Sequence, residues 1–210
     1  MQQTYVLNPR KIAILLITIA LCLSIISIIS EYLLFVVFAD SESNTLVILD
    51  LFSVNIENSI PTWYATILLL TASVILALIA HAKWSARAPY RWHWAGLALV
   101  FLYLSIDEGA GIHEYMADFL FDAFQTTGYL YFAWQIVAVP LVVIFGLLYI
   151  PFLFALPPFT RYGFIISGAI YTGGALFIEG ISANYLYSQD GVYDFTYLSI
   201  ATVEETFEMI

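Results

Sequence analysis

The feature of this sequence that most limits its fold is a series of long runs of apolar residues. The first run extends from Ile12 to about Phe38 and carries no charged side chain until Glu31. A helix needs about 20 apolar residues to cross a hydrocarbon layer about 30 Å thick. Because 62% of the residues are hydrophobic and only 10% are charged, the chain suits a lipid bilayer better than water. We therefore predict an integral membrane protein.

The apolar runs predict an all-α, polytopic transmembrane bundle of about six helices, in a single domain that covers residues 1–210. Five of the runs are long enough to be complete spans. The sixth supplies only about 21 Å of rise before Ile210, so we expect the chain to continue past this residue. The predicted spans are residues 12–38, 61–80, 92–116, 130–153, 162–186 and 197–210.

The charges predict how these spans are oriented. The six basic residues all fall on one predicted side of the membrane: Arg10, Lys11, Lys83, Arg87, Arg91 and Arg161. In the predicted loops on the other side, every charged residue is acidic. The positive-inside rule therefore places the basic side and the N-terminus in the cytoplasm. The net charge of -10 argues against nucleic acid as a partner, because phosphate contacts need a basic surface.

Several acidic residues lie inside the predicted spans, where they are costly. Counting 1.5 Å per residue places them in the outer half of the bilayer. An ionised carboxylate at this depth needs a proton, water or a cation. No Lys or Arg lies at this level, and His113 is the only side chain there that can carry a positive charge. The acidic residues are Glu31, Asp107, Glu108, Glu114, Glu179, Glu204, Glu205 and Glu208.

Helical spacing indicates which of these residues can converge. Glu204, Glu205 and Glu208 lie within about 100° of one helix face. The residues from Ser105 to Glu114 do not share a face, but Gly109 and Gly111 permit a bulge or break. In the fifth span, Gly173 and Gly174 permit close helix packing. We therefore expect the third, fifth and sixth spans to surround the acidic zone, with the first span peripheral to it and Glu31 outside the site.

Two short strings resemble a known pattern. The string Leu104-Ser-Ile-Asp-Glu108 with the following His113-Glu114, and the later Glu204-Glu205-x-x-Glu208-Met209, resemble a family of uncharacterised bacterial multi-pass membrane proteins. The resemblance covers about the second half of the chain and implies a bacterial inner-membrane location and a polar site, but no particular activity. A weaker similarity to membrane di-iron oxidases lacks the two E-x-x-H pairs that those carboxylate sites use.

The leading hypothesis for this zone is a site for one or two divalent metals. The expected ligands are Glu108, His113, Glu179, Glu204 and Glu208, with Asp107, Glu114 and Glu205 bonded to the ligands rather than to the metal. Such a mixture of oxygen and nitrogen suits iron, manganese or zinc better than calcium. If the protein is an enzyme, the metal would activate water or oxygen. The single cysteine, Cys22, excludes a disulfide within the chain and a thiolate metal site.

Three other functions fit parts of the sequence. The carboxyl groups can form a hydrogen-bonded network that only holds helices together. The chain can be an accessory subunit whose apolar helices pack against other membrane subunits, pigments or lipids. It can also be a cation- or proton-coupled transporter, although the first, second and fourth spans offer almost no polar residues for the inner half of a path.

Overall fold

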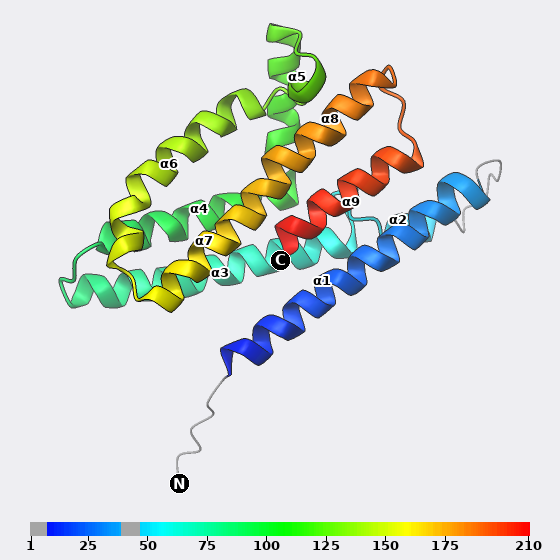
Figure 1. Ribbon diagram of the computed structural model, residues 1–210. Coiled ribbons are helices and arrows are strands. Elements are labelled where there is room, and N and C mark those ends of the chain that lie inside the picture. Colours follow the sequence, from blue (N-terminus) through cyan, green and yellow to red (C-terminus); the bar gives the residue numbers. More distant parts are fainter. Residues whose placement is uncertain (1–7, 39–46) are drawn as a thin grey trace.

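The computed structural model describes residues 8–38 and 47–210, and within these residues every regular element is a helix (Figure 1). Four helical segments are long and apolar enough to cross a membrane: Pro9–Val37, Ile60–Ser85, Gln135–Ala155 and Pro158–Ser188. A fifth candidate is the pair Arg91–Ala110 and Ile112–Phe124, which is bent by 76°. Large apolar side chains are exposed along these helices, as expected of surfaces that contact lipid. The chain is therefore built as a helical membrane protein.

The first segment consists of α1 (Pro9–Tyr32) and a π-helical turn, η1 (Leu33–Val37). Helix α1 begins at Asn8, whose side chain accepts hydrogen bonds from the backbone N–H groups of Arg10 and Lys11. Its buried face is polar and small, and the rest is apolar and exposed to lipid. The buried residues are Ala20, Ser24, Ser27, Ser30 and Glu31. This stripe lets another helix approach α1 closely.

Helices α3 (Ile60–Ser85) and α4 (Arg91–Ala110) form an antiparallel hairpin with the most extensive contact in the fold. The Ser59 side chain accepts a hydrogen bond from the N–H of Thr62 at the start of α3. Ser73 and Ser105 donate across the pair to backbone carbonyls of Ala98 and Thr66. A core that includes Leu76, Trp94 and Phe152 closes the end of the hairpin nearest the α3–α4 turn. A short helix, α2 (Val47–Asp50), precedes the pair.

The second half of the chain returns across the same body (Figure 1). Helix α5 (Ile112–Phe124) and the short turn η2 (Gly128–Leu130) lead into α6 (Gln135–Ala155). One long segment then runs from α7 (Pro158–Thr172) through the π-helical η3 (Gly173–Ile178) to α8 (Glu179–Ser188). Helix α9 (Phe195–Met209) follows and packs against α7, η3, α8 and α1.

Asp194 fixes the start of α9 by accepting a hydrogen bond from the N–H of Tyr197 at 2.8 Å. This bond and a second one from the Tyr185 hydroxyl hold the pKa of Asp194 below its ordinary value. The carboxylate is therefore charged beside the positive end of the helix dipole, where negative charge is favourable.

The structure supports an all-helical fold with four candidate membrane spans, or five if the bent pair is one span. The segment predicted at 197–210 is present as α9, but its 15 residues are fewer than a complete span needs. Helix α1 packs along α9, a contact that the sequence does not predict. The predicted connection from residues 39 to 60 lies partly outside the described residues.

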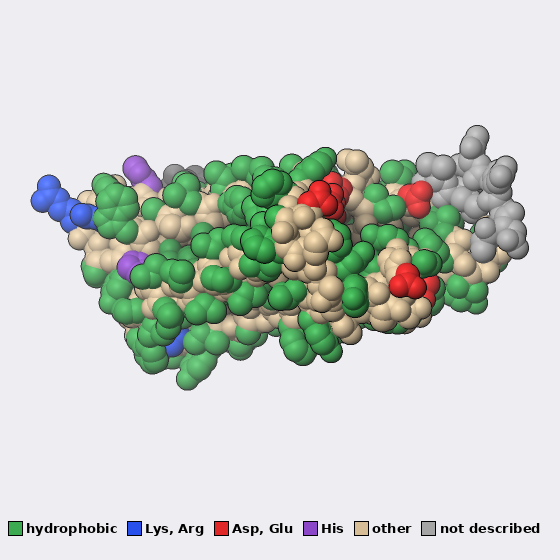
Figure 2. All heavy atoms as spheres, turned by 90° about the horizontal axis from the view of Figure 1, so that it is seen from above, with side chains coloured by type: hydrophobic (Ala, Val, Ile, Leu, Met, Phe, Trp, Pro, Cys, Tyr) green, Lys and Arg blue, Asp and Glu red, His purple; other side chains and the backbone are tan. Residues whose placement is uncertain are grey.

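The charges divide along the molecule. Figure 2 shows basic side chains at one end of the surface and acidic ones toward the other. The α3–α4 and α6–α7 turns lie at the basic end, and the α8–α9 turn lies at the opposite end (Figure 1). The structure thus separates basic from acidic side chains along its length, as the sequence predicts.

Candidate functional site

The site is organised by a sharp break between α4 and α5. Gly111 separates the helices with a φ of 57°, in the left-handed region that glycine adopts without strain. A Cβ atom at this position would overlap the carboxylate of Glu57, which packs against the bare backbone of Gly111. The predicted break in this glycine-containing stretch is confirmed. As a consequence, Asp107 and His113 face each other across the bend instead of pointing apart.

Asp107 holds His113 with two hydrogen bonds. Its Oδ1 accepts the backbone N–H of His113 at 2.9 Å, and its Oδ2 lies 3.0 Å from Nδ1 of the ring. The Asp107 side chain is 13% exposed and the His113 side chain is 32% exposed, so the pair is sheltered but not sealed. The contact at Nδ1 fixes the orientation of the imidazole and leaves Nε2 as the nitrogen available to another partner.

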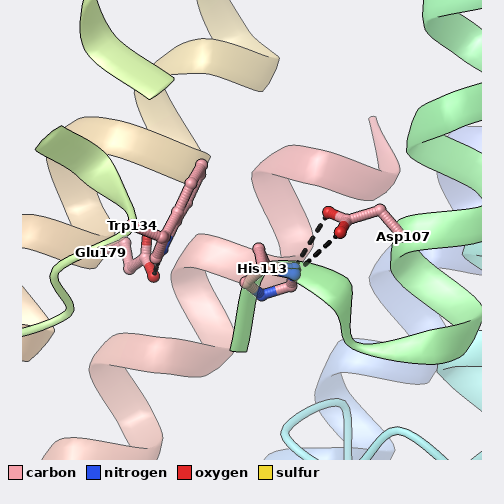
Figure 3. A network of polar contacts seen from close by, with 4 residues as sticks. All are labelled: Asp107, His113, Trp134 and Glu179. Carbon is pink, nitrogen blue, oxygen red and sulfur yellow. Dashed lines mark hydrogen bonds and ion pairs between the residues drawn. The ribbon is translucent and has the colours of Figure 1, made fainter. Parts of the chain in front are cut away.

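A second group of polar side chains lies beside the imidazole. The ring centroids of His113 and Trp134 are 5.3 Å apart, and Figure 3 shows His113 between Asp107 and the Trp134–Glu179 pair. Trp134 Nε1 donates to Glu179 Oε1 at 2.6 Å, and Gln135 Nε2 donates to Glu179 Oε2 at 3.1 Å. The carboxyl group of Glu179 is therefore held in place on both of its oxygens.

The acidic residues of α9 complete the cluster from a third side. Ser182 donates to Glu204 Oε2 at 3.1 Å, which connects α8 to α9. Gly174 makes this close packing possible, because a Cβ there would lie only 2.9 Å from the carbonyl oxygen of Glu204. Glu204, Glu205 and Glu208 are each partly buried. Of the glycine pair that the sequence singled out, Gly174 therefore allows two helices to approach.

The charges of the predicted site residues act on one another. Glu108 lies within electrostatic range of His113, Asp107 and Glu57. Glu208 has Glu108, Glu204 and Glu179 as its electrostatic neighbours. The remaining two predicted residues belong to the same group, since Glu205 and Glu114 also interact with members of it. Five separate segments, α4, α5, α8, α9 and the one before α3, thus bring at least eight carboxyl groups and one imidazole into one zone.

These side chains do not form a finished metal cage. Among the residues that the structure describes, no group of three or more His, Cys, Asp or Glu side chains is placed as a metal ion would require. Glu179 and Glu204 are instead bonded to neighbouring donors. The chemistry of the set suits a divalent ion, and a metal would need the carboxylates of α4 and α9 to turn toward His113 Nε2.

Glu31 lies in a different polar cluster and is not part of this zone. Glu31 is 2% exposed, and its carboxyl group is bonded to Ser27, Ser53 and Asn55, with Thr202 of α9 3.3 Å away. A second hydrogen bond between α1 and α9 joins Thr206 and Ser24 at 2.6 Å. The Glu31 cluster therefore joins α1 to α9 and to the segment before α3.

Sequence reasoning missed three residues of the site. Trp134 and Gln135 stand at the start of a predicted apolar span, and the amide of Gln135 was the available signal because a buried amide needs hydrogen-bond partners. Glu57 lies before the second predicted span, where the sequence predicts an outer loop. Its contact with Gly111 depends on how the chain before α3 folds back, and no local pattern reveals that.

The fold and the site together define a polytopic helical membrane protein with a polar site at a broken helix. Comparison with known proteins agrees with this class without adding an activity. The chain belongs to the family described as a domain of unknown function, DUF8692, whose model matches residues 12–210. No curated protein and no solved structure matches the chain. The family thus covers nearly all of the chain, the first two spans included.

Proposed function

We propose that this protein binds a divalent metal ion in the zone between α4, α5, α8 and α9, with His113 Nε2 as the nitrogen ligand. The observation that carries the proposal is the pair of hydrogen bonds that Asp107 accepts from the backbone N–H and the ring of His113. A metal-binding histidine almost always bonds through its other ring nitrogen to a carboxylate or carbonyl group, which fixes the ring and raises its basicity. Asp107 occupies this position at Nδ1.

The surrounding carboxyl groups supply the oxygen ligands of the proposal. Glu108 and Glu208 are the first candidates because they are electrostatic neighbours of each other, whereas both oxygens of Glu179 already accept hydrogen bonds. Glu179 and Glu204 remain candidates, and each would bind the metal with an oxygen lone pair that accepts no hydrogen bond from the protein. Nitrogen and carboxylate together favour iron, manganese or zinc. Such a metal would supply Lewis-acid or redox chemistry on water or dioxygen.

Electrostatics gives the proposal its physical reason. At least eight carboxyl groups gather where the structure offers one imidazole as the nearby cation. Ionised carboxylates in a membrane interior are expensive unless a cation or proton compensates them. A divalent ion would compensate two charges at once. We also propose that this end of the protein lies in the outer half of a bacterial inner membrane, with the basic end in the cytoplasm.

The test measures metal content in detergent-purified protein. We expect wild type purified without chelator to hold iron, manganese or zinc in stoichiometric amount. His113→Ala should lose this metal. Asp107→Asn keeps the ligand but weakens its orientation, so it should lower metal affinity about 10- to 100-fold. Asp122→Asn, which changes an exposed carboxylate on the same helix as His113, is the control and should bind like wild type.

A competing role is a hydrogen-bonded network that holds the helices together, and the bonds to Glu179 favour it for that residue. Under this alternative, wild type binds none of the three metals even after they are added. Glu208→Gln should then leave both metal content and stability close to wild type, because an amide and a protonated carboxyl are similar hydrogen-bonding groups. A metal-free wild type would overturn the proposed function.

A further inference from the structure

The basic end of the molecule contains a cavity that the proposed metal site does not use. It has a volume of about 180 Å³ and lies between the α3–α4 turn and the α6–α7 turn. The first turn contributes Lys83, Tyr90 and Trp94, and the second contributes Phe152, Leu156 and Pro157. It is separated from the Asp107–His113 pair by most of the length of α4.

The lining of this cavity is amphiphilic. Lys83 is its only charged residue, and the other lining side chains are apolar or aromatic. Trp94 and Phe152 are buried at 8% and 1% exposure, so they form a fixed apolar wall rather than mobile surface groups. A ligand for such a lining needs a negative charge on one part and apolar surface on another.

The other cations of these two turns are already engaged or lie outside the cavity. The Arg91 guanidinium stacks over the Trp84 ring at 4.9 Å. Arg161 donates to the backbone carbonyl oxygens of Leu153, Phe154 and Leu156 at the end of α6. Among the described residues, Lys83 has no ion pair within 4.0 Å. Its charge is therefore available to an anion from outside the protein.

Charge and location select the occupant. In the described chain, the carboxylate residues lie toward the other end of the molecule. Their negative charge is therefore far from the cavity and does not oppose an anion there. The aromatic side chains Trp84, Tyr90 and Trp92 surround these turns, and such residues settle at the level of lipid head groups. Basic pockets between membrane helices at this level bind anionic head groups.

We propose that this cavity binds the phosphate head group of an anionic phospholipid, with Lys83 as the partner of the phosphate. The volume equals that of roughly six water molecules, which suits a head group and leaves the acyl chains outside. The chains would then lie along the exposed apolar surface near the end of α6, where Ile150 and Phe154 face outward. Inorganic phosphate lacks the apolar part that this lining requires.

The experiment compares lipids that stay bound after purification. Protein is reconstituted with phosphatidylglycerol and phosphatidylcholine in equal amounts, and native mass spectrometry counts each lipid that the released protein retains. Wild type should retain phosphatidylglycerol preferentially. Lys83→Gln should reduce that preference about fivefold, the effect of one basic residue near an anionic surface. Lys11→Gln removes the same charge from the start of α1, outside the cavity, and should keep the wild-type preference.

Three results would overturn the proposal: equal retention of both lipids by wild type, an unchanged preference in Lys83→Gln, or displacement of phosphatidylglycerol by inorganic phosphate alone. The thermal unfolding midpoint of Lys83→Gln in detergent, without added lipid, should match wild type, which shows that the variant is folded. Lys83 lies outside the proposed metal site, so metal content should match wild type in this variant and failure here does not bear on that site.

Discussion

At the scale of single residues, the site depends on one backbone position that only glycine fills easily. Gly111 turns α4 into α5 and brings Asp107 opposite His113. The same absence of a side chain gives the Glu57 carboxylate its place at the start of α5, where the helix dipole favours negative charge. The two hydrogen bonds between Asp107 and His113 and the packing of Glu57 therefore all depend on one missing Cβ atom.

Replacing Gly111 with Ala should destabilise the fold. A positive φ costs a residue with a Cβ about 1–2 kcal/mol, and the new methyl group must also displace Glu57. Unfolding in detergent, followed by circular dichroism, measures the loss. Gly168→Ala is the matched control, because this helical glycine has no heavy atom within 4 Å of its would-be Cβ, and it should be neutral or stabilising by up to about 1 kcal/mol.

The double variant Glu57→Ala, Gly111→Ala separates the two causes. Removing the carboxylate relieves the overlap but not the backbone strain, so the double variant should recover only part of the lost stability. If Gly111→Ala were as stable as Gly168→Ala, the bend would not require glycine and the geometry described for His113 would be wrong.

At the scale of elements, the π-helical η3 packs closely against α9 near the site. A Cβ on Gly174 would lie 2.9 Å from both the Glu204 carbonyl oxygen and the Phe207 Cβ. The adjacent Gly173 has no heavy atom within 4 Å of the same position. Two neighbouring glycines therefore have different roles, although their sequence context is the same.

Gly174→Ala should push α9 away from η3 and cost about 1–3 kcal/mol, as overpacking usually does. Gly173→Ala makes the identical chemical change one residue earlier and should have little effect on stability. Thermal unfolding of both proteins in the same detergent compares them directly. Equal losses in the two variants would show that α9 does not pack where the structure places it.

The elements also show what the sequence could and could not predict. Apolar runs and glycine positions were enough for the spans, the break at Gly111 and the contact at Gly174, because these depend on local composition. The contact between α1 and α9 was not predicted. The available signal was a stripe of small and polar residues along α1, formed by Ala20, Ser24, Ser27 and Glu31. Without knowledge of a partner helix, such a stripe could equally face lipid.

The sequence was enough to predict which acidic residues and which histidine belong to the candidate site, but not how they contact one another. A carboxylate inside an apolar run is conspicuous in a sequence, so the acidic residues and His113 could be selected from cost alone. Their partners could not. The bond from Trp134 to Glu179 joins residues 45 positions apart, and an aromatic residue in an apolar run has no pattern that marks it as a donor.

At the scale of the whole molecule, the separation of charges predicts a fixed orientation. The basic end should face the cytoplasm and the turn between α8 and α9 should face outward. In a Cys22→Ser background, Ser188→Cys should react with a membrane-impermeant maleimide added to intact cells. Ser85→Cys should react only after the membrane is permeabilised. Both serines are exposed, and each change replaces one oxygen with sulfur.

The opposite pattern, with Ser85→Cys reactive from outside and Ser188→Cys protected, would invert the topology. It would also move the proposed lipid site to the outer leaflet, although the chemistry of its lining would be the same. Labelling of both positions from one side would mean that the segments between them cross the membrane an even number of times, contrary to the arrangement of α4, α6 and α7–α8.

The polar contact between α1 and α9 has a consequence for synthesis. Glu31 and its partner Thr202 are 171 residues apart, and Ser24 and Thr206 are 182 apart. Ribosomes add about 5–20 residues per second, so about 9–36 s separate the appearance of the two partners. During that interval the first helix is in the membrane with a buried carboxyl group that lacks its final neighbour. A nascent chain in this state would need a temporary companion, and the contact cannot form until α9 has been made.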